Sequence, residues 1–89
     1  MSVSETIRDK LSRAFAPLDM EIVDESARHA GHAGAQPGGE THFRVTIVSA
    51  GFQGLSRLAR QRAVNAVLAD ELRTRVHALS LVTQAPDEV

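Results

Sequence analysis

The sequence predicts a single α+β domain, residues 1–89, in which helices cover a three-stranded mixed sheet. Three observations predict this class: apolar residues recur every fourth position near the N-terminus, three short segments alternate apolar and polar side chains, and a second helical segment separates the last two of them. A chain of 89 residues can bury one modest core but not two. The expected order is helix, strand, strand, helical segment, strand.

The first helix is expected to end before Pro17, because proline has no N–H group to continue it. Ser2 and Glu5, three residues apart, have the spacing of a capping box at its start. Four apolar residues share one face of this helix and are candidates for the core: Val3, Ile7, Leu11 and Phe15.

Three segments have the alternation that indicates strands. Residues 19–24 (DMEIVD) alternate weakly, and residues 42–49 (HFRVTIVS) have the clearest pattern in the chain. Residues 76–83 (VHALSLVT) are the third strand, and a polar tail is expected over 84–89. The first two strands can pair antiparallel, whereas the crossover through a helix favours a parallel second and third strand.

The connection between the first two strands is expected to be a mobile loop, residues 27–40. Its sequence, ARHAGHAGAQPGGE, has five glycines or prolines and no apolar side chain larger than alanine, so neither a helix nor a strand gains enough burial to form. GFQG (51–54) then ends the second strand. Ser56 can cap the helical segment that follows, whose apolar residues have helical spacing: Val64, Val67, Leu68 and Leu72.

Composition limits the function classes. The formal net charge of -1 argues against a protein that coats nucleic acid with clustered cations. The chain has no cysteine, so disulfides are excluded and any iron–sulfur site must take its thiolates from another molecule. No signal-peptide pattern is present at the N-terminus, and no apolar run approaches the ~20 residues that span a bilayer. We expect a cytoplasmic protein with no membrane partner, a monomer or weak homodimer when alone.

Five short motifs occur in order over most of the chain: DES before the histidine-containing loop, GGETHF, VS at a strand end, FQG before a helix, and VHALSL. Together they resemble the BolA family, in its short bacterial form. The resemblance implies a class II KH-like topology, α-β-β-α(α)-β, which agrees with the order above. It also implies a partner of monothiol glutaredoxin that ligates a shared 2Fe-2S cluster, in iron–sulfur cluster trafficking and iron or redox regulation. The alternative is a KH-like, nucleic-acid-binding transcriptional regulator, since some bacterial members are described as binding DNA in the stress response.

Two features depart from the family pattern. The Arg-His-Arg that is usual at the start of the second helical segment reads Arg60, Gln61, Arg62 here, so any role of the middle histidine is absent. The chain also stops soon after the third strand, without the C-terminal extension that many members carry.

The resemblance implies metal ligands at His77 and in the loop at His29, with His32 able to substitute for His29. His77 is expected at the start of the third strand, on the row of Leu79 and Leu81 that faces the covered side of the sheet. Without the resemblance, His77 would be interpreted as a partly buried histidine bonded to a carbonyl, and the loop histidines as solvated.

Two imidazoles can replace two cysteines on one iron of a cluster. The remaining thiolates would come from the glutaredoxin and its bound glutathione, and no cofactor is expected in the isolated protein. Because an unperturbed imidazole titrates near ~6.5, protons compete with iron in mild acid. The heterodimer is therefore expected to lose its cluster between about pH 7 and pH 5.

Other uses of these residues are less favoured. His42 alternates with Arg44 on the other face of the sheet and is expected to be structural. A zinc site could use all four histidines, but their spacing matches no zinc pattern. An enzyme is not expected, because no oxyanion hole or orienting third group accompanies the four residues of hydrolytic type, Asp24, Glu25, Ser26 and His29.

A second candidate surface surrounds the start of the second helical segment. GFQG is formally the GxxG element with which KH domains clamp a nucleic-acid backbone, although a turn into the helix is the preferred interpretation. Arg57, Arg60 and Arg62 could form a positive strip, together with Arg73 and Arg75 further along the chain. This strip could contact DNA phosphates or the carboxylates of glutaredoxin or glutathione. Phe52 is expected to be a core residue or a partner-facing anchor. The candidate partner or nucleic-acid residues are Gly51, Phe52, Gly54, Arg57, Arg60 and Arg62.

Overall fold

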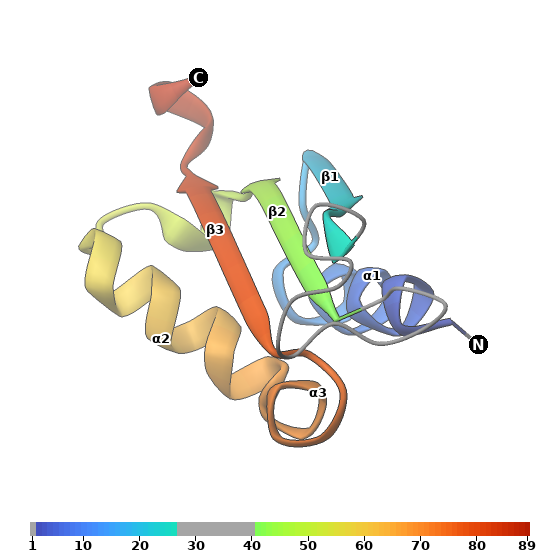
Figure 1. The fold of residues 1–89 in the computed structure, drawn as a ribbon. Coiled ribbons are helices and arrows are strands. Elements are labelled where there is room, and N and C mark those ends of the chain that lie inside the picture. Colours follow the sequence, from blue (N-terminus) through green and yellow to red (C-terminus); the bar gives the residue numbers. More distant parts are fainter. Residues whose placement is uncertain (1, 27–40) are drawn as a thin grey trace.

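The computed structural model describes residues 2–26 and 41–89, so the loop expected over 27–40 lies outside the described residues. The helices and strands follow each other in the expected order and confirm the α+β fold (Figure 1). No helix in the two described ranges is long and apolar enough to cross a membrane. The elements, with η for a 3-10 helix, are α1 (Val3–Phe15), β1 (Asp19–Asp24), β2 (His42–Val48), η2 (Ala50–Phe52), α2 (Arg57–Val67), α3 (Ala69–Thr74), β3 (Ala78–Gln84) and η3 (Pro86–Glu88).

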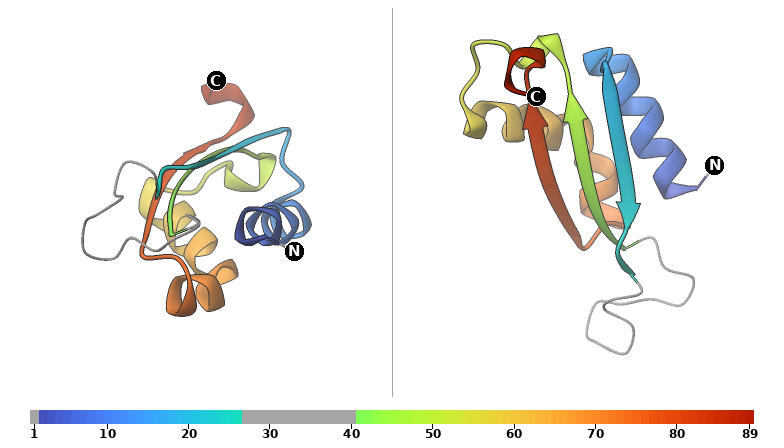
Figure 2. Two further views of the ribbon diagram at one scale, coloured as in Figure 1. Left: turned by 45° about the vertical axis from the view of Figure 1, so that its right-hand side comes forward. Right: turned by 90° about the horizontal axis from the view of Figure 1, so that it is seen from above.

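β2 is the central strand of the sheet, in the order β1-β2-β3. It pairs antiparallel with β1, where Ile22 faces Val45, and parallel with β3, where His42 faces Ala78. The parallel pairing brings the first residues of β2 and β3 to the same end of the sheet. We call this the histidine end, since it carries His42 and, just before β3, His77. The helices α1 to α3 lie on one face of the sheet (Figure 2).

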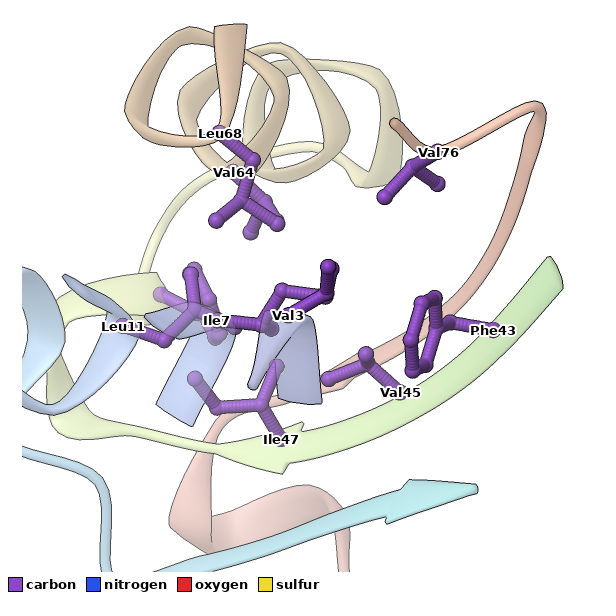
Figure 3. Close-up of a cluster of buried hydrophobic side chains, with 10 residues drawn as sticks. Val3, Ile7, Leu11, Phe43, Val45, Ile47, Val64, Leu68 and Val76 are labelled. Carbon is purple, nitrogen blue, oxygen red and sulfur yellow. The ribbon is translucent and has the colours of Figure 1, made fainter. Parts of the chain in front are cut away.

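The core lies between these helices and the covered face of the sheet (Figure 3). The apolar residues that share one face of α1, and those that alternate along β2, are buried there as predicted, and Phe15 packs half-buried against them. Full burial of each large apolar side chain is worth roughly 1.5–3 kcal/mol. The buried core residues are Val3, Ile7, Leu11, Phe43, Val45, Ile47, Phe52, Val64, Leu68 and Val76.

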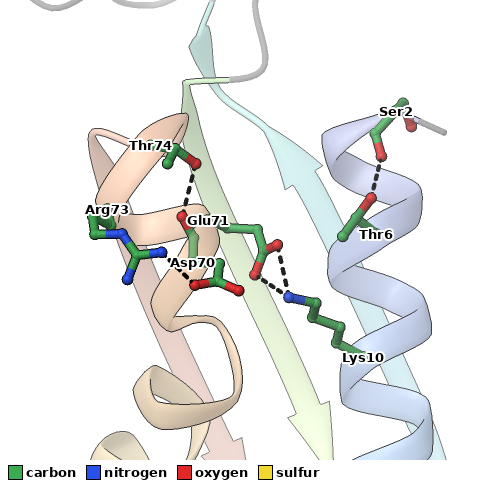
Figure 4. Close-up of polar contacts among 7 residues, drawn as sticks. All are labelled: Ser2, Thr6, Lys10, Asp70, Glu71, Arg73 and Thr74. Atoms are coloured by element: carbon green, nitrogen blue, oxygen red, sulfur yellow. Dashed lines mark hydrogen bonds and ion pairs between the residues drawn. The ribbon is translucent and has the colours of Figure 1, made fainter.

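α1 is held at both ends and near its middle. At its start, Ser2 Oγ accepts the N–H of Glu5 at 3.0 Å and donates to the Glu5 carboxylate at 3.1 Å, which confirms the predicted cap. At its end, Ala16 leaves the helix with a left-handed φ of 43°. An ion pair of 2.9 Å between Lys10 Nζ and Glu71 Oε2 ties α1 to α3 (Figure 4). The hydrogen bond to Glu71 raises the pKa of Lys10 above its usual value.

The third strand begins two residues later than predicted. Val76 is buried in the core, and its N–H donates to the Glu71 carbonyl at 2.8 Å. His77 forms a bend, and Ala78 makes the first pair with β2. The alternation at the start of VHALSLVT therefore comes from a connection with one buried residue rather than from strand pairing.

The second helical segment and the chain end carry more local structure than the sequence pattern indicates. Ser56 caps α2 as predicted, its Oγ accepting the N–H of Ala59 at 3.1 Å. Leu68 then separates α2 from α3. Within the segment expected as a polar tail, Gln84 ends β3, Ala85 is fully buried and η3 follows.

Candidate functional site

His77 is an exposed residue at the histidine end. Its N–H donates to the carbonyl oxygen of Thr41 at 2.8 Å, which fixes its backbone beside the start of β2. The expectation that His77 lies within the strand and faces the covered side is wrong. Parallel pairing starts at His42 and Ala78, so His77 precedes the first pair and its imidazole remains accessible.

Thr41 connects His77 to the residues that flank the 27–40 segment. It is fully buried, and its carbonyl also accepts the N–H of Ala78 at 3.3 Å. Its own N–H donates to Ser26 Oγ at 3.2 Å, across the intervening segment. Ser26 and Thr41, on either side of residues 27–40 in the sequence, are therefore joined to each other, and Thr41 is joined to His77.

Ser26 has a structural role at this junction. It is only 4% exposed, and both its N–H, at 2.9 Å, and its hydroxyl donate to Asp24 Oδ1. Its Oγ also accepts the N–H of Thr41. A buried hydroxyl with these bonds is not positioned as a nucleophile, since attack requires an accessible oxygen beside a base. Ser26 instead joins Asp24 at the end of β1 to Thr41 just before β2.

His42 lies beside His77 and is half-buried. Its position on the face opposite Phe43 is confirmed by the burial pattern of β2. Its Nδ1 lies 2.8 Å from Thr41 Oγ1. The rings of His42 and His77 are stacked, with centroids 6.1 Å apart and planes at 27°. Sequence reasoning predicted that the second and third strands are parallel but missed this pair, because it did not give the register that brings His42 beside His77, 35 residues later.

The two loop histidines lie outside the described residues, so the structure gives no position for His29 or His32. Among the residues that are described, no group of three or more His, Cys, Asp or Glu is placed to hold a metal ion. The described part of the histidine end thus offers one exposed imidazole with a second one stacked against it.

Arg60 does not belong to a binding surface, contrary to expectation. Its side chain is 9% exposed, and its Nη1 and Nη2 donate to the two carboxylate oxygens of Glu88 at 2.6 and 2.8 Å. It also donates to the carbonyls of Leu55 and Thr83, at 3.0 and 3.2 Å. The Arg60 hydrogen bonds, together with the N–H of Ala85, lower the pKa of Glu88 to about 2. The hydrogen bonds of Arg60 therefore join α2 to β3 and η3.

Phe52 is likewise a core residue and not a partner-facing anchor. It is fully buried, with its ring centroid 5.0 Å from that of Phe15 and 6.0 Å from the Arg60 guanidinium carbon. Gly54 has a φ of 78°, which a turn into α2 requires and glycine allows without strain. The candidate residues that do lie exposed are Gly51, Gly54, Arg57 and Arg62.

Comparison with known proteins decides the family. Residues 11–88 match the family described as BolA-like protein. The chain belongs to the BolA family. It is 49% identical over 92 residues to the uncharacterized protein in the cobS 5'region of Sinorhizobium sp, covering 99% of this chain and 96% of that protein. It is 47% identical over 83 residues to the DNA-binding transcriptional regulator BolA of Escherichia coli strain K12, covering 93% of this chain and 75% of that protein.

Solved structures of the family share the fold. The BolA domain of SufE1 from Arabidopsis thaliana superposes with a TM-score of 0.89 at 44% identity, covering 100% of this chain and 98% of that one. Several plant and mammalian relatives are longer, and this BolA chain spans 24% to 59% of their lengths.

The cluster expected of a BolA protein can be tested against this donor set. The chain has no cysteine, so it cannot supply the thiolates that iron–sulfur clusters usually need. An exposed imidazole on a fixed backbone at the end of a sheet is, however, suited to complete the coordination of a cluster that a second molecule partly holds. The residues present fit a shared cluster and not one held by this chain alone.

Proposed function

We propose that this BolA protein is the partner of a monothiol glutaredoxin and ligates a shared 2Fe-2S cluster, in iron–sulfur cluster trafficking and iron or redox regulation. The observation that carries the proposal is the position of His77. Its exposed imidazole belongs to a residue bonded to Thr41, which is bonded in turn to Ser26, and the two candidate loop histidines lie between Ser26 and Thr41 in the sequence.

Both candidate loop histidines follow Ser26 closely in the sequence. His29 follows Ser26 by three residues, so their Cα atoms are at most about 11 Å apart. His32 follows by six residues and can be about 21 Å away. Both histidines are candidates for the second ligand, and His29 is placed first because the family resemblance matches it. When bound, a cluster with two imidazoles on one iron is less negatively charged and has a higher reduction potential than an all-thiolate cluster.

Substitution of His77 tests this function. With glutathione and a cluster-loaded monothiol glutaredoxin, we expect the wild-type chain to give a coloured one-to-one complex whose visible absorption and circular dichroism differ from those of the glutaredoxin alone. His77→Ala should lose the new spectrum, because one iron loses a ligand. His29→Ala and His32→Ala, measured in parallel, identify the loop ligand.

Ser80→Ala is the matched control, since Ser80 is exposed on β3 three residues from His77 and carries no metal-binding ring. It should retain the full spectrum. A His77→Ala complex with unchanged stoichiometry and spectrum would contradict the proposal.

DNA binding is the second candidate function, because a relative that is 47% identical is named a DNA-binding transcriptional regulator. Arg57 and Arg62 remain exposed on α2 and can meet phosphates, whereas Arg60 is buried. Replacing both exposed arginines by alanine should weaken binding to duplex DNA and reduce the slope of log affinity against log salt by about two. His77→Ala should leave the DNA affinity unchanged. An unaltered slope in the double variant would remove this candidate.

The proposal also assigns the protein to binding rather than enzyme chemistry, in agreement with the buried and bonded hydroxyl of Ser26. Its location in the cytoplasm and its monomeric or weakly dimeric state when alone are part of the same proposal.

A further inference from the structure

The two imidazoles at the histidine end are not equivalent. His77 is exposed on a bend, while His42 is half-buried at the first position of β2. An exposed side chain that precedes a strand ordinarily samples several rotamers, and ordering it when a ligand binds costs conformational entropy. Some feature of the fold must limit this freedom if His77 is to bind an iron in a defined orientation.

His42 has the means to do so, because its own ring is held. Its Nδ1 lies 2.8 Å from the hydroxyl of Thr41, a fully buried residue. The backbone of β2 fixes the base of the side chain and this contact fixes one edge of the ring. A ring held at both places is a rigid surface.

The ring of His77 stacks on that surface. The centroid distance of 6.1 Å is within the 4.5–7 Å range of favourable aromatic pairs. The Thr41 carbonyl, which accepts the N–H of His77 at 2.8 Å, belongs to the same residue whose hydroxyl contacts His42. Thr41 therefore fixes the backbone of one histidine and the ring of the other.

We propose that His42 is a positioning residue for His77: its fixed ring backs the exposed imidazole and holds it in the orientation that binds the cluster. This inference rests on the proposed function of His77 as a ligand. His42 acts through stacking, so phenylalanine, which keeps the ring but loses the contact with Thr41, should replace most of its effect, whereas alanine should not.

Three variants of the full chain test the proposal: His42→Ala, His42→Phe and, as a matched control on the same strand and face, Thr46→Ala. In the isolated protein, NMR measures the ring-proton shifts of His77, which depend on the stacked ring. In the glutaredoxin complex, loss of visible absorbance measures the rate of cluster release. We expect His42→Ala to move the His77 ring signals and to speed release about three- to tenfold. His42→Phe should restore the release rate to within about twofold, and Thr46→Ala should match wild type in both measurements.

Two outcomes would overturn the proposal. If His42→Ala leaves the His77 signals and the release rate unchanged, the stacking has no positioning role. If His42→Phe releases the cluster as fast as His42→Ala while Thr41→Val releases it at the wild-type rate, a nitrogen of His42 is required for something other than its contact with Thr41, and the residue is a ligand. Thr41→Val, which keeps the buried shape but removes the hydroxyl, provides a second variant should His42→Ala not fold, and we expect it to shift the His77 ring signals in the same direction.

A failure of the proposed function is separately visible. In that case His77→Ala would retain the complex spectrum, while the NMR shifts of the isolated protein would still report whether His42 orders His77.

Discussion

At the scale of single residues, the pairing of Arg60 with Glu88 shows how the side chain of a charged residue can be buried. The guanidinium gives hydrogen bonds to a carboxylate and two carbonyls, so its burial is compensated by three acceptor groups. Removing only one partner of such a pair leaves a buried charge without compensation, which is strongly unfavourable.

This pair predicts a dependence of stability on pH. The pKa of Glu88 is lowered from 4.5 to about 2, so the pair stabilises the fold fully above about pH 4.5, and this contribution is lost as the pH falls toward 2. Glu88→Gln should therefore lower the free energy of unfolding at pH 7, with the difference from wild type shrinking between pH 4.5 and pH 2. Urea denaturation over this pH range measures it.

Asp87→Asn is the control for this experiment. Asp87 is the exposed neighbour of Glu88 and accepts a 3.3 Å hydrogen bond from Gln53 Nε2. Its substitution should change the unfolding free energy little at any pH. A constant difference between Glu88→Gln and wild type down to pH 2 would contradict the assigned pKa.

At the scale of elements, α1 is capped at its end by an alanine in a backbone conformation that is unfavourable for this residue type. Ala16 adopts a φ of 43° and a ψ of 57°, the left-handed region that commonly ends helices and that glycine occupies without steric cost. For an alanine the Cβ makes this conformation unfavourable by about 1–2 kcal/mol.

Ala16→Gly should stabilise the protein by roughly 0.5–1 kcal/mol, since relief of the Cβ contact exceeds the added entropy of the unfolded chain. Ala14→Gly, an exposed position in the last turn of the same helix, should instead destabilise by about 0.5–1 kcal/mol. Thermal and urea unfolding of both variants measure the two effects. Equal destabilisation by both substitutions would show that the left-handed conformation is not costly at Ala16.

At the scale of the whole molecule, the sequence predicted the elements whose periodicity reflects burial. α1 and β1 have the expected bounds, and β2 ends at Val48, one residue before its expected end, because their apolar residues face a single core. The start of β3 was missed because Val76 is buried without belonging to a strand, which alternation cannot distinguish. Local patterns also could not show the burial of Arg60, since its partner Glu88 lies 28 residues away.

Sequence reasoning selected His77 for the candidate site but expected His42 to be structural and did not predict the pairing of the two rings. The family motifs indicated His77 as a ligand, but its exposure and its contact with His42 both depend on the register in which β2 and β3 pair. Both are properties of the assembled sheet. The register between strands that are distant in the chain is set by the packing of the entire core.

The direction of β3 also places the C-terminus of the chain far from the histidine end. β3 starts beside His77 and its seven residues extend about 23 Å toward the C-terminus, which lies at the opposite pole (Figure 1). A fluorescent reporter or affinity tag fused after Val89 would therefore stand clear of the imidazoles. Such a fusion would allow the binding of partners at the histidine end to be followed inside living cells without blocking that end.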